Sequence, residues 1–347
     1  MSRARREKGT TRRRFLRDLA LVGVVGRSLL DGRDVRAALA DAAEEASGPW
    51  PDMSYRKLGK TEFMGSRLVF GCGAALSSSP RDDLLDRAFD AGVNVFDVGT
   101  SRYYRDAEKN LASFLRRRRD QILLISKASP YIDIDPNEIV SVSQAREGAR
   151  TWSKLLDESL GELGVERVDA YYVMAANNPS IIRAEEMHEA FLAAKRAGKV
   201  KHWGLSTHEN AQRVLEAAIQ TGWYSLAQIA ITPAGWYSWA DKKVLPDSPA
   251  MTQLQPLFER ARKAGIGMIG MKAGRFIAGR KWFGWGNPGA FDGHYSAGLL
   301  AADLSPFQRS YAYVLEHGLD AVNADMQELS HLAENFRAAA MSAELVA

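Results

Sequence analysis

Short apolar stretches alternate with longer amphipathic stretches along the chain from Ser54 onward. The apolar stretches are five to seven residues long, which is typical of buried strands, and the stretches between them have the apolar period of helices. The expected strands are 67–73, 93–97, 121–127, 168–174, 200–206, 225–231, 266–272 and 319–324.

Glycines follow several amphipathic stretches, where they would end helices. The expected helices are 81–92, 149–164, 184–199 and 211–222, with Gly92, Gly164, Gly198 and Gly222 at their ends. Strands that alternate with helices predict a parallel sheet with right-handed crossovers. Eight such repeats in about 290 residues favour the α/β fold class, as a closed (β/α)8 TIM barrel. The alternative is an open doubly wound sheet, although no G-x-G-x-x-G follows the first strand.

The chain before the first barrel strand divides into three parts. Residues 1–40 are basic, residues 41–53 are polar and small with two prolines, and the barrel region is 54–347. We interpret 41–53 as a linker. The turn at Leu58-Gly59-Lys60 predicts a short N-terminal β-hairpin.

The basic charge of the protein belongs to its N-terminus. Residues 1–40 hold eleven Lys/Arg and four Asp/Glu, a net of +7, so the chain's total of +4 leaves −3 for the rest. A body of that charge gives no reason to expect nucleic acid as a partner.

The N-terminus has the order of an export signal: basic residues, the apolar run Leu19 to Gly26, then small residues at Ala38 and Ala40. Thr11 to Arg17, T-R-R-R-F-L-R, resembles the twin-arginine signal. We therefore expect recognition by the twin-arginine export machinery and a periplasmic protein. A disordered basic tail or a basic amphipathic helix on a membrane is the alternative. The apolar run is shorter than the roughly 20 residues of a membrane span, and no later stretch qualifies.

Cysteine and histidine usage limits the chemistry. The single Cys72 cannot form an intramolecular disulfide, and the six histidines lack H-x-x-x-H spacing. We expect no metal site.

Polar residues stand at the ends of the expected strands, which meet at the rim where TIM barrels carry their active sites. Asp97 ends the second strand, Lys127 ends the third, and Tyr103 and Tyr104 follow the second. A lysine that an aspartate keeps charged lowers the pKa of a neighbouring phenol, which can then exchange a proton with a carbonyl oxygen. The alternative is a structural ion pair at the rim, with tyrosines packed on a helix.

From Ser54 onward the sequence resembles the aldo-keto reductase family over nearly its full length. The resemblance lies in an ordered series of segments: YRKLGKTEFMGSRLVFGCG, DAGVNVFDVG, YYRDAEKNLASFL, LLISK, SLGELGVERVDAYYV, AGKVKHWGLST and GIGMIGMK. It implies a (β/α)8 barrel that reduces aldehydes and ketones with NADP or NAD as cofactor, or runs the reverse reaction.

The resemblance assigns roles by position. Asp97, Tyr104 and Lys127 match the catalytic core, and Tyr103 remains a rival to Tyr104 because two extra residues precede the tyrosines. The positions that match cofactor contacts are Ser206, Thr207 and Gln228 for the nicotinamide carboxamide, Lys272 for the pyrophosphate, and Glu334 and Asn335 near the adenine.

The sequence departs from the family pattern at four places. Met174 stands five residues after Asp169, where the family has a catalytic histidine, and a thioether offers no N–H. Arg105 replaces the glycine after the tyrosine, and Met271 replaces a tyrosine that stacks on nicotinamide. The fourth departure is the phosphate-binding motif, which has Asp325, an anion near the expected 2′-phosphate, and His331 in place of an arginine; NADP and NAD both stay open. Asn177 and Asn178 are the nearest groups that could replace the missing hydrogen bond.

Aromatic residues gather in the segments after the sixth and seventh expected strands. They are Trp236, Tyr237, Trp239, Trp282, Phe283, Trp285, Phe291 and Tyr295. Rings at a barrel mouth suit sugar or aromatic carbonyl substrates, or they pack on each other. We predict an atypical oxidoreductase acting on a small carbonyl or sugar; the alternative is a non-catalytic cofactor-binding or sensing pseudoenzyme.

Overall fold

The computed structural model describes residues 50–278 and 286–346. The predicted signal 1–40, residues 41–49 of the linker, and Trp282, Phe283 and Trp285 lie outside the described residues. No helix within the described residues has the length and apolar character needed to cross a membrane.

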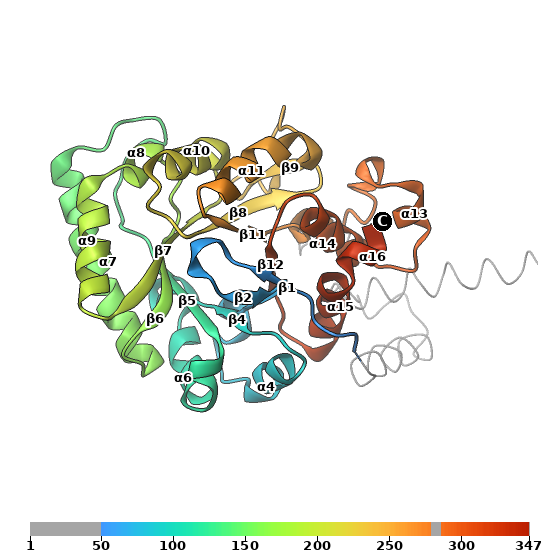
Figure 1. Ribbon diagram of the computed structural model, residues 1–347, viewed down its shortest axis with the longest axis horizontal. Helices are drawn as coiled ribbons and strands as arrows, with labels where there is room; N and C mark the ends of the chain where they lie inside the picture. Colours follow the sequence, from blue (N-terminus) through green and yellow to red (C-terminus); the bar gives the residue numbers. More distant parts are fainter. Residues whose placement is uncertain (1–49, 279–285, 347) are drawn as a thin grey trace, which may run out of the picture.

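A closed barrel of parallel strands forms the centre of the molecule (Figure 1). Its strands are β3 (Leu68–Gly71), β4 (Val95–Asp97), β5 (Leu123–Ala128), β6 (Val168–Val173), β7 (Val200–Thr207), β8 (Leu226–Thr232), β11 (Gly267–Met271) and β12 (Ala321–Asp325). Neighbours pair in parallel around the ring, and the β7–β8 pairing completes it. The predicted TIM barrel is confirmed, and each expected strand overlaps an observed one.

Helices surround the barrel on its outside (Figure 1). They are α3 (Cys72–Ala75), α4 (Asp82–Asp90), α5 (Ser101–Tyr104), α6 (Ala107–Arg118), α7 (Val142–Leu163), α8 (Pro179–Ile182), α9 (Glu185–Arg196), α10 (Ala211–Thr221), α11 (Gln255–Lys263), α12 (Arg275–Ala278), α13 (Ala297–Ala301), α14 (Pro306–Glu316), α15 (Leu329–Ala340) and α16 (Ser342–Val346), with 3-10 turns η2 (Arg119–Gln121), η3 (Met251–Leu254) and η4 (Asp292–His294). Helix α7 begins earlier than the expected 149, because Ser141 and Gln144 form a capping box at its start.

The predicted N-terminal hairpin is present as β1 (Tyr55–Lys57) and β2 (Met64–Ser66), which pair antiparallel around the turn η1 (Gly59–Thr61). Leu58 of this hairpin is fully buried among residues of the barrel interior. The Lys60 amide donates to the Gly265 carbonyl, just before β11 begins. The hairpin therefore covers the end of the barrel where the strands start.

A second hairpin follows β8, where the sequence suggested only a loop. Strands β9 (Gly235–Ser238) and β10 (Lys243–Val244) pair antiparallel, and β9 continues the sheet from β8. Most of the described aromatic residues expected at the rim are buried instead, namely Trp236, Tyr237, Phe291 and Tyr295. Among the described residues of that set, Trp239 is exposed, with 36% of its surface accessible to solvent.

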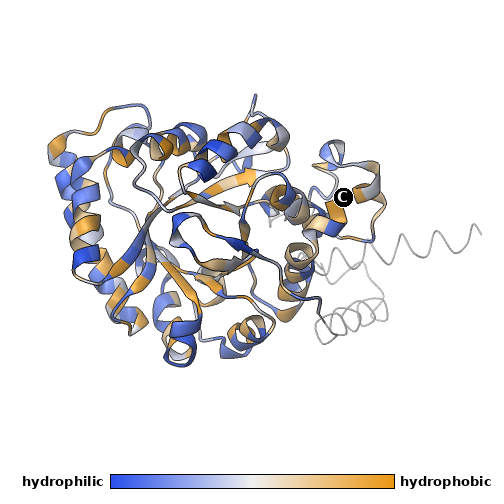
Figure 2. Ribbon diagram, viewed as in Figure 1, coloured by the Kyte–Doolittle hydropathy of each residue, from blue (hydrophilic) through white to orange (hydrophobic). Residues whose placement is uncertain are grey.

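Side chains inside the barrel divide into an apolar layer and a polar layer. The apolar layer consists of Leu58, Val69, Val95, Leu123, Ile125, Ala170, Tyr172, Leu226, Ile269 and Ala321. A larger apolar cluster lies outside the strands, under the helices. In Figure 2 the strands are mainly hydrophobic and the outer helix surfaces hydrophilic. Successive side chains of a strand point alternately into and out of the barrel. The inward-pointing residues at the carboxyl ends of the strands therefore form the polar layer, nearer the mouth than the apolar layer.

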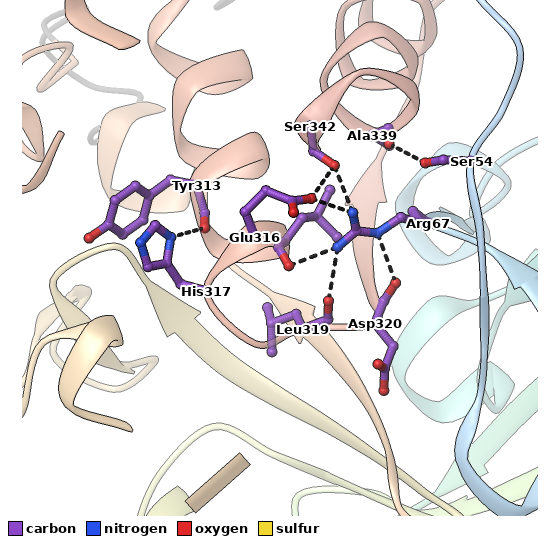
Figure 3. A network of polar contacts seen from close by, with 10 residues as sticks. Ser54, Arg67, Tyr313, Glu316, His317, Leu319, Asp320, Ala339 and Ser342 are labelled. Atoms are coloured by element: carbon purple, nitrogen blue, oxygen red, sulfur yellow. Dashed lines mark hydrogen bonds and ion pairs between the residues drawn. The ribbon is translucent and has the colours of Figure 1, made fainter. Parts of the chain in front are cut away.

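Arg67, just before β3, binds residues of the C-terminal helices and so connects them to the start of the first barrel strand (Figure 3). Its guanidinium donates to the Leu315 carbonyl at 2.7 Å and to Ser342 Oγ at 2.8 Å, and it pairs with Glu316. Burial acts to raise the pKa of Glu316, but the Ser342 hydrogen bond and the Arg67 charge outweigh it, so the net pKa lies below its ordinary value. This network lies where the strands begin, away from the mouth.

Candidate active site

A buried ion pair joins the ends of β4 and β5. Lys127 Nζ lies 2.5 Å from Asp97 Oδ2 and 2.7 Å from the Val98 carbonyl oxygen. Both side chains are almost fully buried. Burial is the largest effect and lowers the pKa of Lys127, but the charge and hydrogen bond of Asp97, together with the charge of Tyr104, more than offset it. The pKa is therefore raised overall and the lysine stays charged.

Tyr104, on the short helix α5, places its ring against this pair. A Cβ atom at Gly73 would lie 2.5 Å from the Tyr104 ring, and one at Gly99 would lie 2.9 Å from it. Because both residues are glycines, the space that the Tyr104 ring needs is left free. Lys127 Nζ lies 5.6 Å from the ring centroid.

Lys127 lowers the pKa of Tyr104, as expected, but the net pKa is raised. Burial raises the pKa of Tyr104, and the Lys127 charge offsets only part of that rise. Desolvation of a phenolate costs more than one nearby cation restores. The phenol is therefore held protonated, as a proton donor must be.

Tyr103 turns to a different neighbour. It is 48% exposed, and its ring stacks on Tyr131 with centroids 6.2 Å apart and planes 11° apart. This placement favours Tyr104 over Tyr103 as the residue beside Lys127. Arg105, which follows, has φ 52 and ψ −121, a backbone conformation that glycine adopts readily and other residues rarely do.

Met174 directly follows β6, and 5% of its surface is exposed. Its backbone amide donates to the Ala128 carbonyl, so it sits beside the end of β5. The side-chain oxygen of Asn177 and the whole side-chain amide of Asn178 have other partners. The side-chain oxygen of Asn177 accepts from Thr207 and from two backbone amides of the next loop. Asn178 caps α8 and donates to the carbonyls of Asp135 and Glu138. Asn178 therefore cannot replace the histidine without losing these contacts.

Asn323 of β12 links the ion pair to the expected carboxamide site. Its Nδ2 lies 2.5 Å from Asp97 Oδ2 and 3.2 Å from Gln228 Oε1. Gln228 stands opposite Ser206 in the β7–β8 register, and both are buried. Sequence reasoning missed Asn323; the signal was a polar residue within the apolar run of the last strand.

Two groups of expected cofactor residues take other partners. The Thr207 hydroxyl has one hydrogen, which it shares between the Glu209 carbonyl oxygen at 2.6 Å and Asn177 Oδ1 at 3.0 Å. Glu334 on α15 accepts a hydrogen bond from Ser305 at the cap of α14, and Asn335 beside it is 6% exposed. Glu334 and Asn335 lie on α15, outside the strands β4 and β5 that carry Asp97 and Lys127.

Cations gather around Trp239 at the mouth. The distances to its ring centroid are 3.0 Å for Lys242 Nζ, 4.4 Å for Lys272 Nζ and 5.9 Å for the Arg275 guanidinium carbon. Burial lowers the pKa of Lys272 to about 8, with Arg275 and Lys242 acting in the same direction against Asp325. The cluster has more positive than negative charge near Lys272, as an anion-binding site requires.

His208, after β7, was not among the expected site residues. It stacks on Trp239 with centroids 5.7 Å apart. Burial lowers its pKa to about 3, and the charges of Lys272, Lys127 and Lys242 add to that effect. The imidazole is neutral at physiological pH.

An acidic cavity of about 500 Å³ lies outside the barrel, between the start of α6 and helix α7. It is lined by Glu108, Asp157, Glu158 and Glu162 among others. Glu108 accepts from Ser126 at 2.6 Å on the outer side of β5, so this cavity is separate from the mouth. No group of three or more His, Cys, Asp or Glu within the described residues is arranged to hold a metal.

A family model described as the aldo/keto reductase family matches residues 64–273, more than half of the chain. The chain belongs to the aldo/keto reductase family. This membership implies an oxidoreductase, in agreement with the sequence resemblance.

Solved structures share the fold. A candidate aldo-keto reductase of Pseudomonas aeruginosa aligns with a TM-score of 0.58 at 21% identity, covering 86% of this chain and 98% of that one. An aldo-keto reductase of Klebsiella pneumoniae, solved in complex with NADPH, aligns with a TM-score of 0.58 at 17% identity, covering 83% and 89%. At these identities the likeness shows the barrel and no more.

Proposed function

We propose that the protein is an NAD(P)-dependent aldo-keto reductase that interconverts a small carbonyl compound and its alcohol. The observation that carries the proposal is the buried Asp97–Lys127 pair at 2.5 Å beside the inserted Tyr104 ring. Family membership supports it, because the pair stands where the family's catalytic core is expected.

The residues present fit a nicotinamide dinucleotide. Gln228 and Ser206 offer buried amide and hydroxyl groups to the carboxamide, next to the catalytic pair. The cations around Trp239 supply positive charge for the pyrophosphate, which would relieve their mutual repulsion. The negative charge of Asp325 acts on Lys272 and disfavours a further phosphate, so we propose that NADH binds at least as well as NADPH.

When bound, the cofactor supplies a hydride to the carbonyl carbon. Tyr104 donates its proton to the carbonyl oxygen, and Lys127 stabilises the phenolate that remains. Asp97 holds the lysine ammonium in place. Met174 contributes no N–H, so the substrate oxygen has one donor fewer than a histidine would give. A lost acid–base partner typically costs about 10²–10⁴ in rate, so turnover of simple aldehydes is slow.

The exposed aromatic rings at the mouth suit a substrate with a flat face. Tyr103 of α5 and Tyr131 form a stacked pair, and Trp239 lies exposed on the β9–β10 hairpin. A sugar or an aromatic carbonyl compound offers such a face.

Titration of the purified protein with NADH and NADPH, followed by fluorescence, tests the cofactor; a carbonyl and sugar screen tests turnover. Tyr104→Phe should remove activity while the matched Tyr103→Phe leaves most of it. Binding without turnover, unchanged in Tyr104→Phe, would instead support the cofactor-binding pseudoenzyme that Met174 favours. Failure to bind either dinucleotide would contradict both functions.

We further propose that residues 1–40 direct the folded protein through the twin-arginine route to the periplasm. The support is the T-R-R-R-F-L-R segment ahead of a short apolar run. The double variant Arg12→Lys/Arg13→Lys should accumulate unprocessed in the cytoplasm. A substitution pair in the linker, at Glu44 and Glu45, is the control that should leave export unchanged.

A further inference from the structure

Two polar atoms inside the barrel, the Tyr172 hydroxyl and Oδ1 of Asp97, have no hydrogen-bond partner among the described residues. Tyr172 is fully buried and Asp97 is 4% exposed. Buried polar atoms in proteins are almost always paired, because an unpaired one loses its hydration without compensation. Both atoms therefore require an explanation.

The strand register brings the two residues to the same part of the interior. Tyr172 on β6 stands opposite Lys127 on β5, and Lys127 binds Asp97 on β4. The Tyr172 ring belongs to the apolar layer, beneath the polar layer that holds Asp97. A Cβ atom at Gly204 would lie 2.2 Å from the ring, so the absence of a side chain there admits it.

The electrostatics agree with this placement. Burial raises the pKa of the Tyr172 phenol well above its ordinary value, and the charge that adds to the rise is that of Asp97. The phenol therefore stays protonated and can donate a hydrogen bond. It also lies close enough to Asp97 for the carboxylate charge to act on it.

We propose that Tyr172 is a positioning residue, whose hydroxyl donates to Oδ1 of Asp97 through one buried water. A water with two such polar neighbours is the usual means of satisfying groups that do not touch. Oδ2 of Asp97 already accepts from Lys127 and Asn323. With Oδ1 also engaged, the carboxylate is fixed from both sides, and it holds the Lys127 ammonium toward Tyr104.

The kinetic consequence rests on the proposed function. Tyr172→Phe removes the hydroxyl and keeps the ring. Its neighbour provides a matched control, because Tyr171 is equally buried but bonds Ser159 outside the barrel. We expect Tyr172→Phe to lower kcat about tenfold with KM nearly unchanged, and Tyr171→Phe to leave kcat nearly unchanged.

A double-mutant cycle on the cofactor-free full chain tests the contact without any activity. Unfolding equilibrium constants are measured for Tyr172→Phe, Asp97→Asn and the double variant. We expect a coupling of about fivefold or more between the two sites, and none between Tyr171→Phe and Asp97→Asn. Equal effects of Tyr172→Phe in both backgrounds would overturn the inference. An inactive wild-type protein with an intact coupling would contradict only the proposed function.

Discussion

Asn323 on the last barrel strand donates to the same oxygen of Asp97 that binds Lys127, at 2.5 Å. The same amide group also reaches Gln228, at 3.2 Å. One side chain thus connects the proton-transfer pair with the residue expected to hold the nicotinamide carboxamide. Disturbing it should affect chemistry and cofactor binding together.

Asn323→Ala should lower kcat/KM by about 10- to 100-fold, because a hydrogen bond to a buried charged group is lost. Dinucleotide affinity should fall as well, since Gln228 loses its partner. Steady-state kinetics and fluorescence titration measure the two effects. Asn110→Ala, at an amide that donates to the Leu76 carbonyl outside the barrel, is the control. Wild-type kinetics in Asn323→Ala would show that the contact has no role in catalysis.

Met174→His should increase kcat toward a fixed carbonyl substrate, by about 10²-fold if the rest of the site is poised. Met174 stands at the end of β6 beside the end of β5, the position where the family pattern has the histidine. Met174→Gln adds an N–H without acid–base chemistry and should give a smaller gain. If Met174→His does not exceed the wild type, the site is not poised, and the binding-protein alternative gains support.

Arg105→Gly should stabilise the protein by about 1 kcal/mol, because glycine adopts the φ of 52 and ψ of −121 at this position with little strain. Arg105→Ala keeps a Cβ and should not share the gain. Urea denaturation compares the unfolding free energies. An equal gain in both variants would mean that the arginine side chain, and not the backbone conformation, is the source of strain.

Glu316→Gln should destabilise the protein at neutral pH, and this loss of unfolding free energy should become smaller as the pH falls. The folded-state pKa of Glu316 is depressed, so its contribution is present above the ordinary glutamate value of about 4.3 and is lost as the pH falls through the folded value. Urea midpoints of both proteins from pH 7 downward measure the difference. A pH-independent difference between wild type and Glu316→Gln would contradict the linkage.

Arg67→Met should lower the free energy of unfolding by about 3–5 kcal/mol, because it leaves the Glu316 carboxylate without its cation.

The sequence by itself determined the strands, their order and the closed barrel. Apolar runs of strand length separated by amphipathic stretches have few other ways to bury their apolar residues. It also brought Asp97 and Lys127 to one rim, because both end parallel strands and such ends meet at one face.

Only the tertiary structure decided which groups actually pair. The contact of Asn323 with Asp97 joins residues 226 positions apart, and no local pattern encodes it. The placement of the Tyr104 ring beside Lys127 depends on the space left by Gly73 and Gly99, whereas Tyr103 stacks on Tyr131. The raised pKa of Tyr104 follows from burial, which is a property of the packed barrel. Periodicity fixes which face of an element is apolar, whereas pairing and desolvation depend on distances between elements that only packing sets.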